Sequence, residues 1–503
     1  MPSWSCCWQP TRSSPVLLTP PSTASPLRRR ASLALAAFFA LAVGGACGSA
    51  TVAPAARSGG DWPRFGFDAA RHNSGPATTG IRAANIRRLK RQRVRLPGTA
   101  DSSPIYLRGV GVGGARHDVF FVTTSYGKTV AVDASSGAQL WTFTPAGYSS
   151  WAGSERITNS SPVADASRRF LYAAAPDGRI HKLAVASGAE VRTGGWPVSI
   201  TRLPSREKIG PALNYTHGLV LISTGGYIGD APPYQGHVVV ISAARGRIVH
   251  VWNALCSDRH RLITPSSCRE SGAAIWARSG VVVNPSNRDL LVATGDGSFN
   301  GRSNWGDSVL MLAPKAGRLL RNWTPRNQRE LDSGDVDLGS TAPALLTSTL
   351  AAQSGKDGLV RLLSLRRLGG RLGHVGGALQ AIAAPGHSGV FSTMAVWRAS
   401  RTVRLFVAND SGTWCYVLRR GRLHVSWRRG SAGTSPVVAG GLLYIYNPNG
   451  GLDVLRPATG RRVGRLSAGG GHWNSPIVTD GRIALSEGDA NGHRTSGVLD
   501  IYR

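Results

Sequence analysis

One short step recurs eight times along the chain and constrains its fold more than any other feature. A Ser/Thr/Gly-Pro pair, or an equivalent small-residue step, leads each time into a short apolar strand, in SSPI (102–105), SSPV (160–163), GPAL (210–213), ARSGVVV (277–283), STAPALL (340–346), FSTMAV (391–396), TSPVV (434–438) and NSPIV (474–478). Most copies continue into a second apolar strand and then into a third that ends in a turn. Strands and turns repeating at such intervals are typical of propeller blades.

A single four-stranded blade cannot cover both of its faces, whereas radial stacking buries each blade against its neighbours and leaves only short edges exposed. The eight copies therefore predict an all-β, eight-bladed β-propeller over residues 61–503. Large aromatic residues that recur at the blade period are typical core residues. We expect the tryptophans that close several repeats to pack between blades, namely Trp141, Trp252, Trp323 and Trp427.

The strong positive charge of the chain is compatible with a nucleic-acid partner, but its distribution does not favour one. The formal net charge is +32, from 59 Lys and Arg against 27 Asp and Glu. The basic residues are mostly arginines scattered singly or in pairs, and no basic module interleaved with aromatic residues is present. A compositional preference for arginine explains the charge better than a nucleic-acid interface does, so we predict no nucleic-acid partner.

The N-terminal region predicts export from the cytoplasm. Residues 1–26 form a low-complexity leader, which leaves the true start of translation open, and residues 27–47 resemble a signal peptide with basic residues before an apolar run. Cys47 at the end of that run is a candidate lipidation site, and plain secretion is the alternative. Residues 48–60 form a small-residue linker. The predicted location is extracytoplasmic, as a secreted, periplasmic or cell-surface protein with membrane contact only through a lipid anchor.

Three cysteines lie in the predicted propeller. Cys256 and Cys268 bracket a short loop, and in an oxidising compartment we expect them to form a disulfide, with two free thiols as the alternative. Cys415 lies within an apolar run, where a buried thiol behaves as a small apolar residue. The spacing of these cysteines indicates neither zinc nor a covalently attached heme.

The repeat AVDASSGAQLW (131–141) resembles that of the pyrroloquinoline quinone (PQQ) propellers. Two further segments, DWPRFGFDAARHNSG (61–75) and IRAANIRRLKRQ (81–92), are similar to the opening of quinoprotein alcohol dehydrogenases and of polyvinyl alcohol dehydrogenases. The resemblance implies eight blades around a central channel, with the last blade completed by the N-terminal segment. The same repeats also build non-catalytic lipoprotein scaffolds such as the outer-membrane assembly propeller, so the repeat alone does not imply catalysis.

Two cofactor-binding residues follow from the resemblance. SGAAIWARSGVVVNP (271–285) is similar to the segment whose tryptophan forms the floor beneath the quinone, which implies that role for Trp276. QSGKDGLVRLLSL (353–365) is similar to the segment whose lysine donates to the quinone oxygens, which implies that role for Lys356. The structural alternatives are a core tryptophan and an ordinary K-D-G turn.

The segment ELDSGDVDLGS (330–340) gathers four carboxylates in a basic chain. In the dehydrogenases an acidic D-x-x-D step carries the base that takes the substrate hydroxyl proton, which implies Asp332 as catalytic base and Asp335 as a metal ligand. The chemistry implied is hydride transfer to PQQ beside a bound Ca²⁺. The alternative is that these residues stabilise a turn or pair with arginines.

Two departures from the dehydrogenase pattern concern the metal. Asp296, in ATGDGSFNG (293–301), stands where the dehydrogenases present asparagine and remains an oxygen donor for calcium. The expected glutamate ligand is absent from STGGYIGDAPPYQGHVVVI (223–241), where only Asp230 offers a carboxylate. A vicinal disulfide, carried by many of the dehydrogenases near the quinone, is also absent from residues 61–503.

Three functions remain open at this point. The missing glutamate favours a binding or scaffold propeller with a degenerate quinone pocket and an envelope protein or polymer as partner. The second is a PQQ- and Ca²⁺-dependent dehydrogenase acting on a small or polymeric alcohol, and the third is a basic module that docks on envelope polymers. In the first two cases we expect one pocket at the channel mouth, lined by Trp276, Asp296, Asp332, Asp335 and Lys356.

Overall fold

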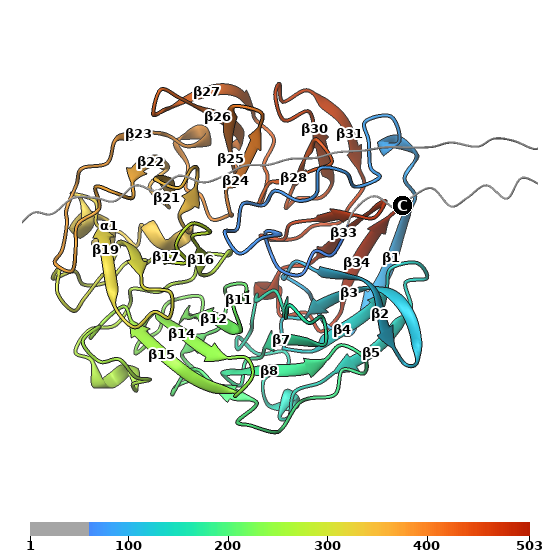
Figure 1. Ribbon diagram of the computed structural model, residues 1–503, viewed down its shortest axis with the longest axis horizontal. Helices are drawn as coiled ribbons and strands as arrows, with labels where there is room; N and C mark the ends of the chain where they lie inside the picture. The colour runs from blue at the N-terminus through green and yellow to red at the C-terminus, as the bar shows by residue number, and fades with distance from the viewer. Residues whose placement is uncertain (1–59) are drawn as a thin grey trace, which may run out of the picture. The chain divides into compact units, whose positions relative to one another are not determined.

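The structure is a computed structural model and describes residues 60–503. The predicted leader, the signal peptide with Cys47 and almost all of the predicted linker lie outside the described residues. Within them, eight antiparallel four-stranded sheets are arranged around a central axis (Figure 1). The predicted all-β, eight-bladed propeller is therefore confirmed.

Seven blades follow one another in chain order, and the first three consist of β2 (Ile105–Val112), β3 (Ala115–Thr123), β4 (Thr129–Asp133) and β5 (Gln139–Phe143); of β6 (Val163–Ala164), β7 (Phe170–Ala174), β8 (Arg179–Ala184) and β9 (Val198–Ser199); and of β11 (Asn214–Thr216), β12 (Leu219–Ser223), β14 (His237–Ser242) and β15 (Arg247–Asn253). The fourth and fifth consist of β16 (Val282–Val283), β17 (Leu290–Ala293), β18 (Val309–Leu312) and β19 (Leu319–Trp323), and of β20 (Ala344–Leu345), β21 (Leu350–Ser354), β22 (Leu359–Ser364) and β23 (Gln380–Ala383). The sixth and seventh consist of β24 (Ala395–Ala399), β25 (Thr402–Asn409), β26 (Gly412–Arg419) and β27 (Arg422–Arg429), and of β28 (Val437–Ala439), β29 (Leu442–Tyr446), β30 (Leu452–Leu455) and β31 (Arg462–Leu466). The eighth consists of β32 (Ile477–Thr479), β33 (Arg482–Glu487), β34 (Gly497–Tyr502) and β1 (Arg91–Leu96).

The remaining elements lie between these strands. They are the ribbon β10 and β13 (Glu207–Lys208, Gly225–Gly226), the helix α1 (Gln328–Ser333) and the 3-10 turns η1 to η6 (Ile86–Arg88, Tyr148–Ser150, Pro265–Ser267, Leu338–Ser340, Pro385–His387, Ala490–Gly492). No helix among residues 60–503 is long and apolar enough to cross a bilayer.

Each of the eight predicted steps enters the first strand of a blade, and several of its hydroxyl groups join neighbouring blades. The backbone amide of Ser103 donates to Ser161 Oγ at 2.8 Å, and the amide of Ser475 donates to Ser103 Oγ at 3.1 Å. Thr393 N donates to Ser435 Oγ at 3.0 Å. Because these serines are buried, their hydroxyl groups satisfy amides that water cannot reach. The recurrent step therefore connects one blade to the next around the channel.

The four predicted tryptophans pack in the hydrophobic layers between blades. Trp252 and Trp323 are buried. Trp141 donates from Nε1 to the carbonyl of Val185 in the following blade at 2.9 Å, and its ring lies against Gly188. A Cβ atom on Gly188 would come within 2.5 Å of that ring, so glycine is required there. Trp427 packs against a glycine of the next blade in the same way.

The ring closes where β1 pairs with β34, which joins the first and the last strands of the described chain in one sheet (Figure 1). Arg91 on β1 contacts Asp500 on β34 at 2.8 Å and also Glu487 on β33. The Asp500 side chain is fully buried. The expected completion of the last blade by the N-terminal segment is therefore observed, and an ion pair at the closing strand holds a charge that would otherwise be costly to bury.

The disulfide loop lies between β15 and β16. In the structure Cys256 and Cys268 are bonded to each other, and Cys415 is a buried free thiol within β26. Burial raises the pKa of the Cys415 thiol to about 12, so this residue behaves as an apolar part of the blade and not as a nucleophile.

Replacing the closing arginine tests the role of this seam. We expect Arg91→Ala to lower the free energy of unfolding by about 2 kcal/mol, because Asp500 and Glu487 would lose the closer of their two arginine partners and keep only Arg93. Arg95→Ala is the matched control, since Arg95 lies on the same strand but is exposed. Urea unfolding monitored by tryptophan fluorescence measures both. Equal stabilities for the two variants would contradict a stabilising role of the buried ion pair.

Candidate functional site

A cavity of about 550 Å³ opens where loops from six of the blades meet across the channel. Every lining loop either precedes the first strand of a blade or joins its second strand to its third, and these loops lie on the same side of a propeller. The lining residues are Asn159, Lys208, Gly210, Gly225, Gly226, Tyr227, Ile228, Gly229, Asp230, Ala274, Trp276, Arg278, Asp296, Asp335, Asp337, Lys356, Phe391, His472, Trp473 and Asn491. A preformed hollow of this size with convergent polar groups is typical of a ligand site.

Five of the predicted site residues line this cavity together: Trp276, Asp296, Asp335, Lys356 and Asp230. Asp332, the predicted catalytic base, does not line it, because it lies in α1 before the chain turns toward the channel. The acid that the sequence reasoning missed is Asp337, which is buried at the cavity wall.

Asp337 connects the acidic residues with the lysine. Lys356 Nζ lies 2.6 Å from Asp337 Oδ2 and 2.5 Å from Asp335 Oδ1. Asp337 Oδ1 also accepts a hydrogen bond from the backbone amide of Asp296 at 2.9 Å. This carboxylate approaches so closely that a Cβ atom on Gly295 would lie 1.7 Å from Oδ1. Glycine at position 295 is therefore required for the arrangement.

Local backbone geometry brings Asp335 and Asp337 to the same place. The chain leaves α1 at Ser333, and Asp335 adopts a left-handed backbone conformation with φ of 50°. This residue turns the chain, and the carboxylates of Asp335 and Asp337 both contact Lys356. The D-x-D spacing of Asp335 and Asp337 was therefore the sequence pattern that indicated Asp337. The D-x-x-D spacing of Asp332 and Asp335 had indicated Asp332 instead.

The acidic end of the cavity carries more negative charge than its lysine can neutralise. Carboxylate oxygens of Asp296, Asp335 and Asp337 all lie within 4.8 Å of one another. Burial and the neighbouring Asp337 raise the pKa of Asp296. Burial also raises the pKa of nearby Asp307 to about 8. Crowded carboxylates of this kind bind protons more readily than isolated ones, and they are also suited to bind a cation.

Lys356 and Asp337 stabilise each other's charged forms. Burial opposes the ammonium of Lys356, yet Asp337 and Asp335 raise its pKa. Burial also opposes the carboxylate of Asp337, yet the hydrogen bond with Asp296 and the charge of Lys356 lower its pKa. Both groups are therefore charged at neutral pH.

Aromatic rings form one wall of the cavity. The rings of Trp276 and Trp473 lie 5.7 Å apart, and Phe391 stacks on Trp473 at 5.6 Å. His472 stacks on the same tryptophan at 3.9 Å. Lys356 Nζ lies 5.9 Å from the centre of the Trp276 ring. Sequence reasoning found Trp276 but missed the other three rings, although Phe391 begins the sixth recurrent step and His472 and Trp473 directly precede the last.

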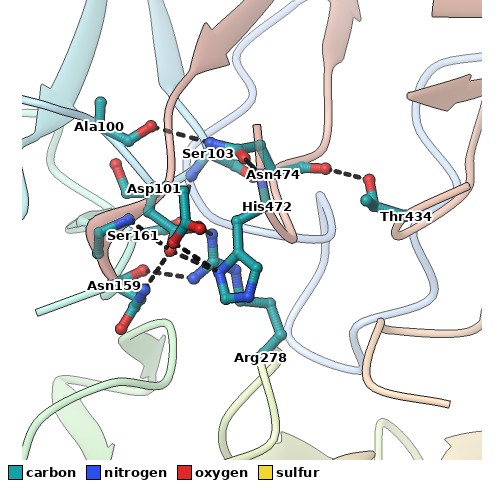
Figure 2. Close-up of polar contacts among 12 residues, drawn as sticks. Ala100, Asp101, Ser103, Asn159, Ser161, Arg278, Thr434, His472 and Asn474 are labelled. Atoms are coloured by element: carbon teal, nitrogen blue, oxygen red, sulfur yellow. Dashed lines mark hydrogen bonds and ion pairs between the residues drawn. The ribbon is translucent and has the colours of Figure 1, made fainter. Parts of the chain in front are cut away.

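Asp101 organises the opposite end of the cavity (Figure 2). It contacts Arg278 Nη2 at 2.9 Å and His472 Nδ1 at 2.8 Å, and it accepts a further hydrogen bond from Asn159. Burial opposes its charge, but Arg278 and then His472 lower the pKa of Asp101 to about 2. Because Nδ1 of His472 faces Asp101, the other nitrogen of its ring is free for a ligand in the cavity.

Lys208 adds a positive charge at this end, where Asp489 Oδ1 also lies 3.6 Å from His472 Nδ1. It lies on β10, where neighbouring side chains point to opposite sides, so Glu207 enters the blade and Lys208 faces the cavity. Lys208 makes neither an ion pair nor a side-chain hydrogen bond with any residue of 60–503, and burial lowers its pKa to about 8. The cavity therefore has an acidic end, which suits a cation, and a basic end, which suits an anion.

The glutamate expected by resemblance is missing from the cavity. Glu207, the nearest glutamate in sequence, is fully buried and contacts His237 Nε2 at 2.8 Å. Asp230, on the loop after β13, does line the cavity, and burial raises the pKa of its carboxyl group. Asp230 is therefore the one carboxylate of this region that a ligand in the cavity can reach.

Comparison with known proteins agrees with this geometry. Residues 84–249 match the family described as outer membrane protein assembly factor BamB. The quinohemoprotein alcohol dehydrogenase of Comamonas testosteroni has a similar structure (TM-score 0.63, 16% identity, covering 88% of this chain and 80% of that one). The chain is an eight-bladed propeller, and part of it matches a family of PQQ-type repeats. The resemblance found in the sequence is thereby confirmed at the level of fold.

Two further structures resemble this propeller. A europium-containing methanol dehydrogenase gives a TM-score of 0.64 at 13% identity, with 88% of this chain and 98% of the other covered. BamB from Moraxella catarrhalis gives 0.50 at 12% identity, with 82% and 98% covered. No curated protein matches the chain in sequence. Catalytic and non-catalytic propellers thus share this fold, and at these identities the likeness concerns the fold alone.

The crowding of carboxylates predicts an effect of pH on the stability of the propeller. A carboxyl group whose pKa is raised on folding favours the folded state fully only below its unfolded pKa of about 3.9, and this contribution is lost as pH rises through the folded value. Asp296→Asn keeps a hydrogen-bond donor toward Asp337 but removes the charge. In the presence of a chelator we expect it to stabilise the protein at pH 7 by about 1 kcal/mol, a modest value because Asp296 is partly exposed.

Thermal unfolding of the wild type and of Asp296→Asn between pH 4 and pH 8 measures this effect. The difference should shrink toward pH 4, where both side chains are neutral. Glu155→Gln is the control, since Glu155 is exposed and lies away from the acidic cluster. A stabilisation that is constant over this pH range would show that charge crowding is not its cause.

Proposed function

We propose that this propeller is an extracytoplasmic PQQ-dependent oxidoreductase that requires a bound cation and oxidises an alcohol. The observation that carries the proposal is the convergence of three carboxylates and Lys356 beside the Trp276 ring in one cavity. A purely structural propeller gains nothing from uncompensated buried acids, whereas a cation and cofactor site requires them. The export signal expected in the sequence supports the location.

The residues present fit the implied cation and cofactor. Asp296 and Asp337 supply hard oxygen donors, which Ca²⁺ and lanthanide ions prefer, and Asp335 lies beside them. The similarity to a europium-containing methanol dehydrogenase supports a lanthanide as well as calcium. The Trp276 ring offers a flat surface for a planar ring system, and the basic end with Lys208 suits the carboxylate groups of PQQ. Asp230 offers a carboxylate where the expected glutamate is missing.

Each side chain has a distinct role in the proposed reaction. When bound, the quinone would accept hydride from the alcohol carbon, and the cation would polarise the quinone carbonyl. Asp296 and Asp337, the more buried acids, would hold the cation. Asp335 is 69% exposed, so it can take the proton from the substrate hydroxyl group and release it to water. Lys356 would donate to the quinone oxygens, and its raised pKa keeps it charged.

A second candidate is a binding propeller without catalysis, which was the first choice from sequence. The stack of Phe391 and Trp473 against Trp276 favours it, because these rings restrict access to one side of the Trp276 ring. The structural likeness to BamB supports it as well. Binding of PQQ decides between the two, since a scaffold has no need of the cofactor.

Calorimetric titration with PQQ, with and without Ca²⁺ or La³⁺, tests the cofactor. We expect binding that depends on the cation and that weakens at least about tenfold in Lys356→Ala, the loss expected for one charge-assisted hydrogen bond in a cavity. Lys315→Ala should bind like the wild type, because Lys315 is exposed and outside the cavity. If PQQ bound with neither cation, a binding propeller without catalysis would be the better conclusion.

A second titration, with La³⁺ alone, tests the cation ligands. Asp337→Asn should abolish tight binding, whereas Asp332→Asn should not change it, because Asp332 lies outside the cavity. Since the pKa of Asp296 is raised without a cation, binding must displace a proton. The affinity should therefore increase with pH. An equal loss of affinity for La³⁺ in Asp337→Asn and Asp332→Asn would contradict this assignment of the ligands.

A further inference from the structure

A second hollow, of about 250 Å³, lies outside the central cavity and shares none of its lining residues. Its floor contains Trp252, Trp305 and Leu319, and its rim carries Arg302, Arg318 and Arg371. These rim residues come from three separate connections, between β17 and β18, between β18 and β19, and between β22 and β23. We refer to this hollow as the arginine pocket. Nothing in the proposed oxidation uses it.

The loops that form the arginine pocket are held together before any ligand binds. The amide of Ser257 donates to the carbonyl of Ser303 at 2.9 Å, and Trp305 donates from its amide to Ala254 O at 3.0 Å and from Nε1 to Ser257 Oγ at 2.9 Å. The amide of Gly373 donates to Gly301 O at 2.7 Å, which fixes the loop of Arg371. The disulfide closes the neighbouring loop. A pocket already ordered in this way loses little conformational entropy on binding.

The three rim arginines carry positive charge that the protein does not neutralise. All three are exposed, and none forms an ion pair with an acidic residue among residues 60–503. Asp258 is the one carboxylate in the lining. Other exposed arginines in the described part of the chain, such as Arg401, also lack an acidic partner there, and what distinguishes these three is that they line one preformed hollow. Three positive charges at one pocket are therefore available to a ligand.

The arrangement of the arginines identifies the chemistry of that ligand. Guanidinium groups recognise phosphate and carboxylate by paired hydrogen bonds. A carboxylate presents two oxygens in one plane, whereas a phosphate group presents oxygens in several directions. Three arginines on three different loops therefore match phosphate better. The rim is open to solvent, so a chain can continue outward from a bound phosphate, and the strong net positive charge attracts polyanions.

We propose that the arginine pocket binds a phosphate group of an anionic polymer, such as a chain of glycerol phosphate units, and that this contact anchors the propeller to phosphate-bearing material outside the cell. The site is distinct from the proposed oxidation site. It therefore holds whether or not the central cavity binds PQQ. A polymer presents many phosphates to one pocket, which strengthens binding by rebinding along the chain.

Fluorescence anisotropy with a labelled glycerol phosphate oligomer tests the proposal. The triple variant Arg302→Gln, Arg318→Gln and Arg371→Gln should bind at least about tenfold more weakly, because it loses the charge-assisted hydrogen bonds. The control replaces Arg401, Arg419 and Arg422 by Gln, exposed arginines of another blade, and changes the net charge equally. It should bind within about twofold of the wild type, since long-range attraction between exposed charges is screened by salt.

Asp258→Asn provides a test that does not depend on losing function. Removal of the one negative charge in the pocket should tighten binding by about two- to threefold, the effect expected of a partly screened surface charge. Thermal unfolding identifies any variant that is not folded. Equal binding by the two triple variants would overturn the proposal, because charge alone would then explain the attraction.

The source of the phosphate is tested with two further probes. Inorganic phosphate should compete with the oligomer only at much higher concentration, and vesicles of phosphatidylglycerol in phosphatidylcholine should not bind through the same arginines. Inorganic phosphate that binds as tightly as the oligomer would overturn the assignment of a polymer. Vesicle binding lost in the pocket variant but kept in the control would assign the pocket to a membrane surface instead.

Discussion

Closure of the ring by β1 is the constraint on which the rest of this structure depends. Each blade covers its faces with its two neighbours, so an open ring would expose the hydrophobic layers at both ends. β1 supplies the outer strand of the blade that β32 to β34 begin, and the buried contact between Arg91 and Asp500 lies at this junction. Once the ring is closed, loops far apart in sequence must meet around one axis. The central cavity is a direct consequence of that meeting.

Closure also explains why the cavity can hold opposite charges at its two ends. Asp101 precedes the first strand of one blade, whereas its partners Arg278 and His472 belong to two others. The acidic end is assembled by a different pair of neighbouring blades, which supply Asp296 on one side and Asp335, Asp337 and Lys356 on the other. The aromatic residues lie between the two groups in the lining. A ligand that satisfies both ends must carry an anionic group and also accept a cation as neighbour.

Much of the fold was predictable because it rests on local, repeated signals. The eight steps gave the number of blades, since each copy enters one first strand. Trp276, Asp296 and Lys356 were found because each lies in a short motif whose neighbours in sequence are also its neighbours in space. Asp332 was chosen over Asp337 because sequence spacing does not show where α1 ends and where the backbone turns at Asp335.

The other unpredicted residues depend on contacts between distant segments. Phe391, Trp473 and His472 form one wall although two blades contribute them. Lys208 and Glu207 are adjacent in sequence, yet only the pairing of β10 with β13 decides which of them faces the cavity. The same limit applies to Arg278, which reads as an ordinary arginine before a strand and is in fact buried against Asp101. Long-range packing, and not local propensity, determines these positions.

The abundance of arginine has two different physical meanings in this molecule. Some arginines are internal donors: Arg71 is buried, donates to the carbonyl of Leu213 at 2.8 Å and has a pKa lowered to about 9 by burial. Arg278 is also buried and donates to the carbonyl of Asn159 at 3.1 Å. Such arginines replace backbone partners that irregular loops cannot provide. Net charge therefore says little about partners by itself, and an arginine indicates a ligand only where several converge, exposed and unpaired, on one preformed hollow.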